Sequence, residues 1–149
     1  MHKAIEMEPN LALAHLWLGF IYMYPKVMDE KAVEHLQIAV NLGLTFALGW
    51  LGCAYGRSGK KEEALKILSQ LDELSKERYI SPLQKSAVYM GLGMYDQAFE
   101  YLEKAFSQKE SFLAVVFYSN KAYSFFPQEF RLDKRYKALM RKMKKTDIE

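Results

Sequence analysis

The stretch LGCAYGRSGKKEEALKIL, residues 51–68, decides the fold of this chain. Its Gly52 and Tyr55 form a Gly-x-x-Tyr pair, and a second such pair, Gly19 and Tyr22, stands 33 residues earlier. A period of 32 to 34 residues also relates three further sets of residues: Tyr22, Tyr55 and Tyr89; Ala32, Ala64 and Ala98; and Leu36, Leu68 and Leu102. Helix-packing residues that recur at this period indicate a stack of helical hairpins.

Apolar residues at three- and four-residue spacing predict helices throughout the repeated region. Ala64, Leu68 and Leu71 share one helical face, and Ala98, Leu102 and Ala105 repeat the arrangement. The alternation that is typical of strands is not sustained anywhere, so an all-α fold is predicted. The expected helices cover about 11–24, 29–42, 45–59, 61–77, 82–93, 95–108 and 133–145.

Start and stop signals divide these helices into hairpins. Gly59 and Gly93 are expected to end helices, because glycine tolerates the left-handed conformation that closes them. The motif SPLQ at 81–84 predicts a capped start, with a serine cap, a proline in the first turn and Gln84 bonding back to the cap. Asp133 is the expected cap of the last helix.

Composition limits the possible function classes. The 149 residues suffice for one well-packed domain, and no run reaches the roughly 18 apolar residues of a membrane span. The single cysteine, Cys53, excludes an internal disulfide and a multi-cysteine zinc site, and it is expected in the core. The compartment stays open, with the cytoplasm slightly favoured.

No motif predicts catalysis, a cofactor or a metal. The stretch GRSGKK at 56–61 has the composition of a phosphate loop but not its spacing, so a turn between helices is predicted. His15 and His35 fall on the two helices of the first expected hairpin and can approach one another, but no cysteine or carboxylate completes a ligand set. The chain is therefore not expected to be an enzyme.

Positive charge is concentrated near the end of the chain, and the remainder is net acidic. Residues 131–145 contain one acid, Asp133, and eight basic side chains: Arg131, Lys134, Arg135, Lys137, Arg141, Lys142, Lys144 and Lys145. Three interpretations stay open, namely a solvated helix face, contact with an acidic partner, and contact with nucleic acid or anionic lipid. Nucleic acid is the least favoured, because no base-stacking side chains interleave with the lysines.

Together these residues resemble the tetratricopeptide repeat (TPR) family, whose unit is a 34-residue helical hairpin. The resemblance implies a right-handed α–α superhelix of about three hairpins at 11–44, 45–78 and 79–108, with capping helices at 109–149. Ser86 stands where the family has glycine. Residues 1–10 resemble the end of a preceding repeat, so we expect that the chain is a fragment of a longer protein or lacks an upstream packing partner.

The C-terminal third carries a further resemblance. GLGMYDQAFEYLEKA at 91–105, FRLDKRY at 130–136 and LMRKM at 139–143 follow one another as in the tail of bacterial multidomain signalling proteins. In those proteins a TPR array follows a DNA-binding, cyclase or kinase domain. The resemblance implies an alternative role as the regulatory or sensory segment of such a protein.

TPR family members bind protein segments in a concave groove that the first helix of each hairpin lines. Carried onto this chain by register, the groove consists of Leu16, Trp17, Phe20, Tyr24, Phe46, Trp50, Cys53 and Arg57. This apolar, aromatic set favours a hydrophobic or amphipathic peptide, or a neighbouring domain of the same polypeptide, over a terminal carboxylate. The groove is either open, or covered by the aromatic segment 112–126 or by an upstream hairpin. The oligomeric state stays open.

Overall fold

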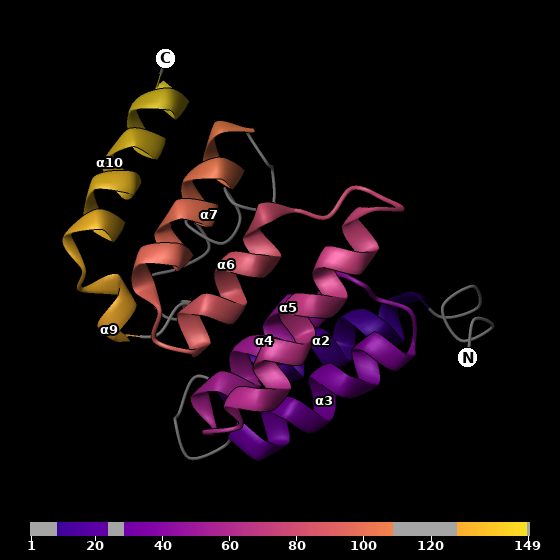
Figure 1. Ribbon diagram of the computed structural model, residues 1–149. Helices are drawn as coiled ribbons and strands as arrows, with labels where there is room; N and C mark the ends of the chain where they lie inside the picture. Colours follow the sequence, from indigo (N-terminus) through magenta and orange to yellow (C-terminus); the bar gives the residue numbers. More distant parts are fainter. Residues whose placement is uncertain (1–8, 24–28, 109–127, 149) are drawn as a thin grey trace.

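Helical hairpins stacked side by side make up the structure, a computed structural model that describes residues 9–23, 29–108 and 128–148. Every regular element within these ranges is a helix, so the predicted all-α class is confirmed. The elements, shown in Figure 1, are α2 (Pro9–Met23), α3 (Asp29–Asn41), α4 (Ala47–Arg57), α5 (Lys61–Ser75), α6 (Pro82–Gly91), α7 (Tyr95–Ser107), α9 (Gln128–Arg131) and α10 (Lys134–Ile148). The expected remnant at 1–10 and the aromatic segment 112–126 fall almost wholly outside the described residues.

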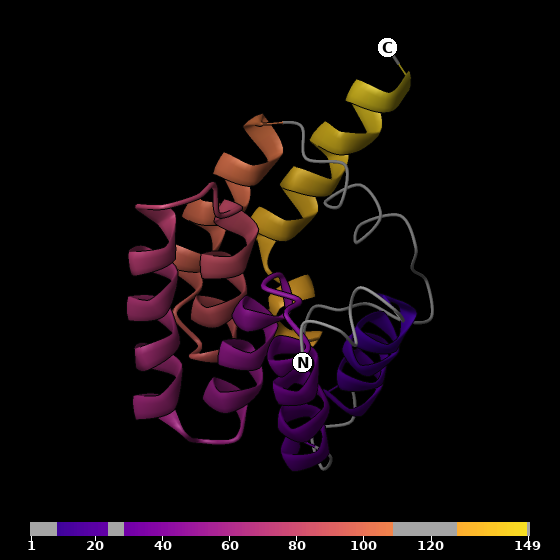
Figure 2. The same ribbon diagram turned by 90° about the vertical axis from the view of Figure 1, so that its right-hand side faces the viewer.

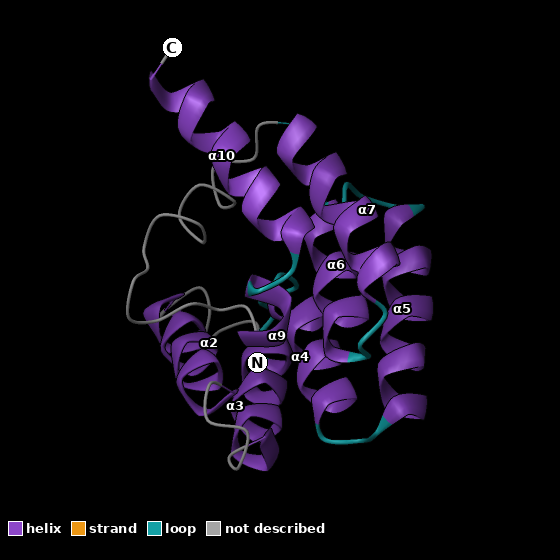
Figure 3. Cartoon of the chain, turned by 90° about the vertical axis from the view of Figure 1, so that its left-hand side faces the viewer, coloured by secondary structure: helices purple, strands orange, loops and turns teal. Residues whose placement is uncertain are grey.

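Neighbouring hairpins meet in two different ways. The hairpins α2–α3, α4–α5 and α6–α7 follow one another, and α10 lies beside α7 (Figure 2). The first and second hairpins meet mainly through α3 against α4, whereas the second and third meet mainly through α4 against α6. Helix α2 begins this series and α10 ends it; Figure 3 shows α10 at the upper left and α2 at the lower left.

One kind of glycine turn ends three of the helices. Gly43, Gly59 and Gly93 have φ values of 95°, 85° and 76°. At the second of them, the Lys60 N–H donates to the Tyr55 carbonyl at 2.9 Å and the Gly59 N–H donates to the Gly56 carbonyl at 3.3 Å. The same pair of bonds follows α3 and α6, which is the Schellman pattern. The predicted ends at Gly59 and Gly93 are confirmed, and Gly43 belongs to the same set.

The predicted helix starts are correct in part. The Ser81 hydroxyl accepts from the Leu83 N–H at 3.1 Å, and the Asp133 carboxylate accepts from the Arg135 N–H at 2.8 Å, so both caps are confirmed. The start at Thr45 is wrong, because Thr45 and Phe46 form a turn and α4 begins at Ala47.

The predicted backward bond of Gln84 is also wrong. Its Oε1 is instead buried and accepts from the Gly49 N–H at 2.9 Å. Gly49 lies in the first turn of α4, where backbone N–H groups have no partner within the helix. Because α6 buries this donor, the nearest polar side chain of α6 bonds to it rather than to its own cap.

Small residues allow the helices to approach closely. A Cβ built on Gly19 would lie 2.6 Å from Leu36, its partner across the first hairpin. One on Gly52 would meet Ile67 of the same hairpin at 3.0 Å and Val88 of the next hairpin at 2.6 Å. These glycines therefore allow close approach of the two helices within each hairpin, and Gly52 serves the junction between hairpins as well.

Residues that repeat along the chain contribute to the core. The three repeated alanines, Ala32, Ala64 and Ala98, are fully buried, and so are two of the three repeated leucines, Leu36 and Leu102. At the position equivalent to Gly19 and Gly52, the buried Ser86 hydroxyl donates to the Ala98 carbonyl at 2.6 Å. The serine thus joins the helices of the third hairpin by a hydrogen bond.

Candidate protein-interaction surface

Half of the predicted groove residues lie inside the stack. Leu16, Phe20, Trp50 and Cys53 are all buried. Phe20 of α2 meets Trp50 of α4 edge to face, with ring centroids 5.1 Å apart and planes at 89°. These side chains therefore join the first and second hairpins, and a partner does not reach them directly in this arrangement.

The other predicted groove residues differ in exposure. Trp17 is 47% exposed, whereas Phe46 and Arg57 are partly buried. The Arg57 Nε lies 3.9 Å from the Asp29 carboxylate, so a charge pair links the end of α4 to the start of α3. Tyr24 is outside the described residues.

Cys53 is a core residue, as predicted. Burial raises the pKa of its thiol to about 12, although the nearby Arg57 opposes that shift. The thiol therefore stays protonated at neutral pH and does not serve as a nucleophile or as a thiolate ligand.

An exposed apolar stripe runs along α2. Leu13, Trp17 and Ile21 are 42%, 47% and 56% exposed. They are spaced four residues apart, so they lie one above the other on a single face of the helix. Among its described residues α2 contains no Asp, Glu, Lys or Arg. We call Leu13, Trp17 and Ile21 the α2 stripe. Ile21 was not among the predicted groove residues, although its position one turn after Trp17 was a usable signal.

The two histidines of the first hairpin do meet. The Nδ1 atoms of His15 and His35 are 2.9 Å apart, and the Tyr22 ring stacks on His35 with centroids 5.3 Å apart. Among the described residues no group of three or more His, Cys, Asp or Glu side chains is placed to hold a metal ion.

The basic side chains near the end of the chain differ in their exposure and in their partners. Arg135 bonds to the Asp133 carboxylate, lies 2.5 Å from the Asp96 carboxylate and covers the Phe99 ring at 4.6 Å. These carboxylates raise its pKa, and the residue attaches α10 to α7. Lys134, Lys137, Arg141 and Lys142 are exposed, while Arg131 is partly buried. The side chains of Lys144 and Lys145 are not among those that the structure describes.

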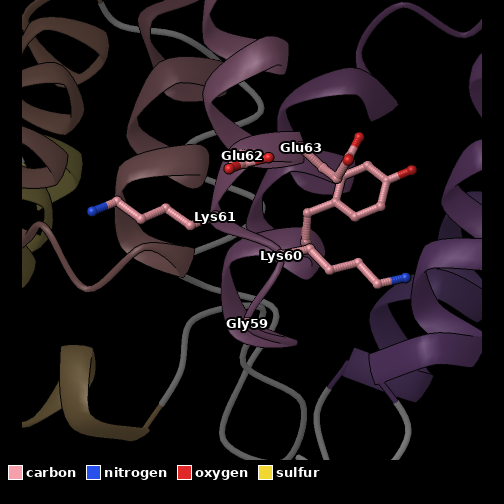
Figure 4. A pocket seen from close by; sticks show the side chains of 6 residues that line it. Gly59, Lys60, Lys61, Glu62 and Glu63 are labelled. Carbon is pink, nitrogen blue, oxygen red and sulfur yellow. The ribbon is translucent and has the colours of Figure 1, made fainter.

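The turn between α4 and α5 holds an open hollow of about 630 Å³, lined by Tyr55 and residues 59–63. Lys60 and Lys61 point in opposite directions there (Figure 4), so they do not converge on one anion as a phosphate loop requires. The predicted turn at 56–61 is confirmed. Burial, followed by the charge of Glu63, raises the pKa of Tyr55, so this phenol stays neutral.

None of the described helices has both the length and the apolar character to cross a membrane. Comparison with family models matches two stretches, 47–78 and 83–112, to the tetratricopeptide repeat. These stretches correspond to the hairpins α4–α5 and α6–α7. Comparisons with curated proteins and with solved structures found no match.

Proposed function

We propose that this chain, in which residues 47–78 and 83–112 match the tetratricopeptide repeat, binds another polypeptide through the α2 stripe. Repeats of this family generally serve as protein–protein interaction modules and form a non-catalytic scaffold. The observation that carries the proposal is the exposure of Leu13, Trp17 and Ile21 on one helical face. Large exposed apolar side chains that gather on one face are typical of interaction sites.

The chemistry of the stripe determines the kind of partner. Tryptophan is enriched among the residues that dominate binding energy at interfaces, and here Leu13 and Ile21 flank it. The described part of α2 offers no charged side chain other than His15 when it is protonated. We therefore infer that the partner is an amphipathic helix whose apolar side chains recur every three or four residues.

The buried groove residues have a supporting role in this proposal. Leu16 and Phe20 alternate with the stripe along α2 and attach the helix to its neighbours, Phe20 through Trp50. They hold the stripe in place, while Trp17 is the member of the predicted groove that contacts the partner. Phe46 precedes α4 and Arg57 ends it, and the Arg57 side chain is only 10% exposed beside Asp29, so these two residues are not assigned a contact with the partner.

The test is a selection of peptides from a random 16-residue phage library on the full chain, followed by measurement of Kd for the enriched sequences. The expected sequences carry apolar residues at helical spacing. Leu13→Glu is expected to weaken binding by at least about tenfold, because it places a charge in an apolar contact. Leu65→Glu is the matched control, since Leu65 of α5 is the same residue at the same 42% exposure. Equal Kd values for the two variants would refute the assignment of the surface.

A second candidate function is regulation within a larger signalling protein, in which α10 contacts an acidic domain or nucleic acid. The exposed side chains of Lys134, Lys137 and Arg141 favour it. Binding of a DNA duplex or of an acidic peptide is then expected to weaken steeply with salt. Replacing these three residues by glutamate is expected to abolish that binding and to leave the peptides of the α2 stripe bound.

A further inference from the structure

The contact between His15 of α2 and His35 of α3 is a hydrogen bond along the line that joins the two rings. The ring planes differ by only 22°, and the ring centroids are 5.2 Å apart. This separation nearly equals the Nδ1···Nδ1 distance of 2.9 Å plus two ring radii. The rings therefore lie edge to edge, with their Nδ1 atoms pointing at one another.

This geometry requires exactly one proton between the two nitrogens. A neutral imidazole has one N–H donor and one bare acceptor nitrogen, whereas a protonated imidazole has two donors and no acceptor. The bond can form when both rings are neutral or when only one ring is charged. When both rings are protonated, two N–H groups and two positive charges face each other across 2.9 Å, and the bond is lost.

Charged groups of both signs surround the pair. The Tyr22 ring lies on His35 at 5.3 Å with planes 12° apart, and the Lys31 ammonium is 5.4 Å from the centre of the Tyr22 ring. Lys31 is also one turn before His35 on α3. The other charged groups described on α3 and on α4, which packs against it, are Asp29 with its partner Arg57, and the exposed Glu30 and Glu34.

We propose that His15 and His35 form a proton-sensitive clasp that holds the first hairpin closed near neutral pH and opens it in mild acid. Histidine is the side chain that changes charge between about pH 5 and 8. The unfolded hairpin takes up two protons there, whereas the closed hairpin keeps its bond with at most one. The unfolded state therefore binds more protons, and the stability of the hairpin falls as the pH falls.

A proton fits this pair better than a metal ion does. The lone pairs of two metal-binding imidazoles converge on one point beside both rings, whereas these two nitrogens point directly at each other. The clasp attaches α2 to α3, and α2 is the helix on which the α2 stripe lies. Its effect on the stability of the hairpin does not depend on whether the stripe binds a partner.

The test compares amide hydrogen exchange of the full chain at about pH 7.5 and about pH 5, with a chelator present and with correction for intrinsic exchange. Opening of α2 and α3 is expected to rise about tenfold in acid, the effect of losing one hydrogen bond and adding like-charge repulsion. The hairpin α6–α7 contains no histidine and is the internal control. An equal rise in both hairpins, or none in the first, would overturn the proposal.

The variant His15→Asn separates the clasp from a purely structural contact. An asparagine amide can accept from a protonated His35 or donate to a neutral one, so its contact is expected to survive at both pH values. Exchange of α2 in this variant should then lack the acid-induced rise. If the variant does not fold, ¹⁵N NMR of the unaltered chain decides the matter. Near neutral pH one ring must carry its proton on Nδ1 and the other on Nε2, and two rings protonated only on Nε2 would rule out the shared bond.

Discussion

The backbone of Cys53 occupies the place where a side chain on Gly91 would begin. On the same interface, a Cβ on Gly56 would lie 2.6 Å from the Gly91 carbonyl carbon, and one on Gly49 would lie 2.7 Å from the Gln84 backbone. Helices α4 and α6 therefore touch backbone to backbone over two turns. Backbone cannot move aside as a flexible side chain can, so this junction does not tolerate even a methyl group.

Gly91→Ala is accordingly expected to destabilise the chain by about 3 kcal/mol or more, the upper end of the cost of overpacking. Urea unfolding followed by circular dichroism measures it. Gly59→Ala is the control, because Gly59 has a φ of 85° but nothing within 4 Å of its Cβ position. The control is expected to cost about 1 kcal/mol, from backbone strain alone. Similar costs for the two variants would contradict the close approach.

Replacing Ser86 by glycine, the residue at the equivalent positions 19 and 52, is expected to destabilise the chain. Ser86→Gly removes the hydrogen bond to the Ala98 carbonyl and adds a flexible residue inside α6, for a combined cost of about 1–2 kcal/mol. Ser69→Gly on the exposed face of α5 is the matched control and carries only the smaller helix-propensity cost. Thermal unfolding distinguishes the two. An equal fall in Tm would mean that the Ser86 hydroxyl does not stabilise the hairpin.

Gln84→Leu is expected to cost about 1–3 kcal/mol, because it leaves the Gly49 N–H buried without its acceptor. Gln70→Leu makes the same change on the exposed surface of α5 and is expected to be nearly neutral. The free energy of unfolding in urea compares the two. Hydrogen exchange of the Gly49 amide should increase in the first variant only, and an unchanged rate there would count against the bond.

The Asp133 cap gives α10 a pH dependence in acid. Hydrogen bonds from the Arg135 side chain and backbone lower the pKa of this carboxyl. Its contribution is therefore complete above about pH 4, the unfolded value, and is lost as the pH falls through the lower native value. Asp133→Ala is expected to cost about 1 kcal/mol at neutral pH, as removal of a helix cap generally does.

Asp133→Asn supplies the control for that prediction, because asparagine caps a helix without titrating. Backbone chemical shifts of α10 measure its helicity through the titration. The native chain should lose helicity at the start of α10 at low pH and the asparagine variant should not. Parallel titrations of the two would show that another group is responsible.

Much of the fold could be predicted from local signals. The period of the tyrosines and alanines predicted the hairpins, since residues that pack at the same place in each repeat must recur at the repeat length. Gly59, Gly93, Ser81 and Asp133 marked helix ends because their effects are local to the backbone. Gln84 did not follow its local motif, because a donor 35 residues away competed for its side chain.

The surface was harder to predict than the hairpins. The register of the family placed Phe20 and Trp50 along a groove, yet they pack on each other. The first and second hairpins meet mainly through α3 against α4, whereas the second and third meet mainly through α4 against α6. The two junctions therefore differ, although identical stacking of the repeats would make them alike. This difference depends on how the helices pack against one another, so the sequence of a single helix does not predict it.

By itself the sequence determined the all-α class, the repeat period, the helix ends at glycine and the burial of Cys53. Each of these follows from backbone preference and apolar spacing along the chain. Only the tertiary structure decided that His15 meets His35 along a shared hydrogen bond, that Ser86 replaces a glycine contact with a bond, and that Leu13, Trp17 and Ile21 stay exposed. Exposure and pairing depend on how whole helices pack against one another, and an apolar helix such as α2 has no polar face to specify which side remains outside.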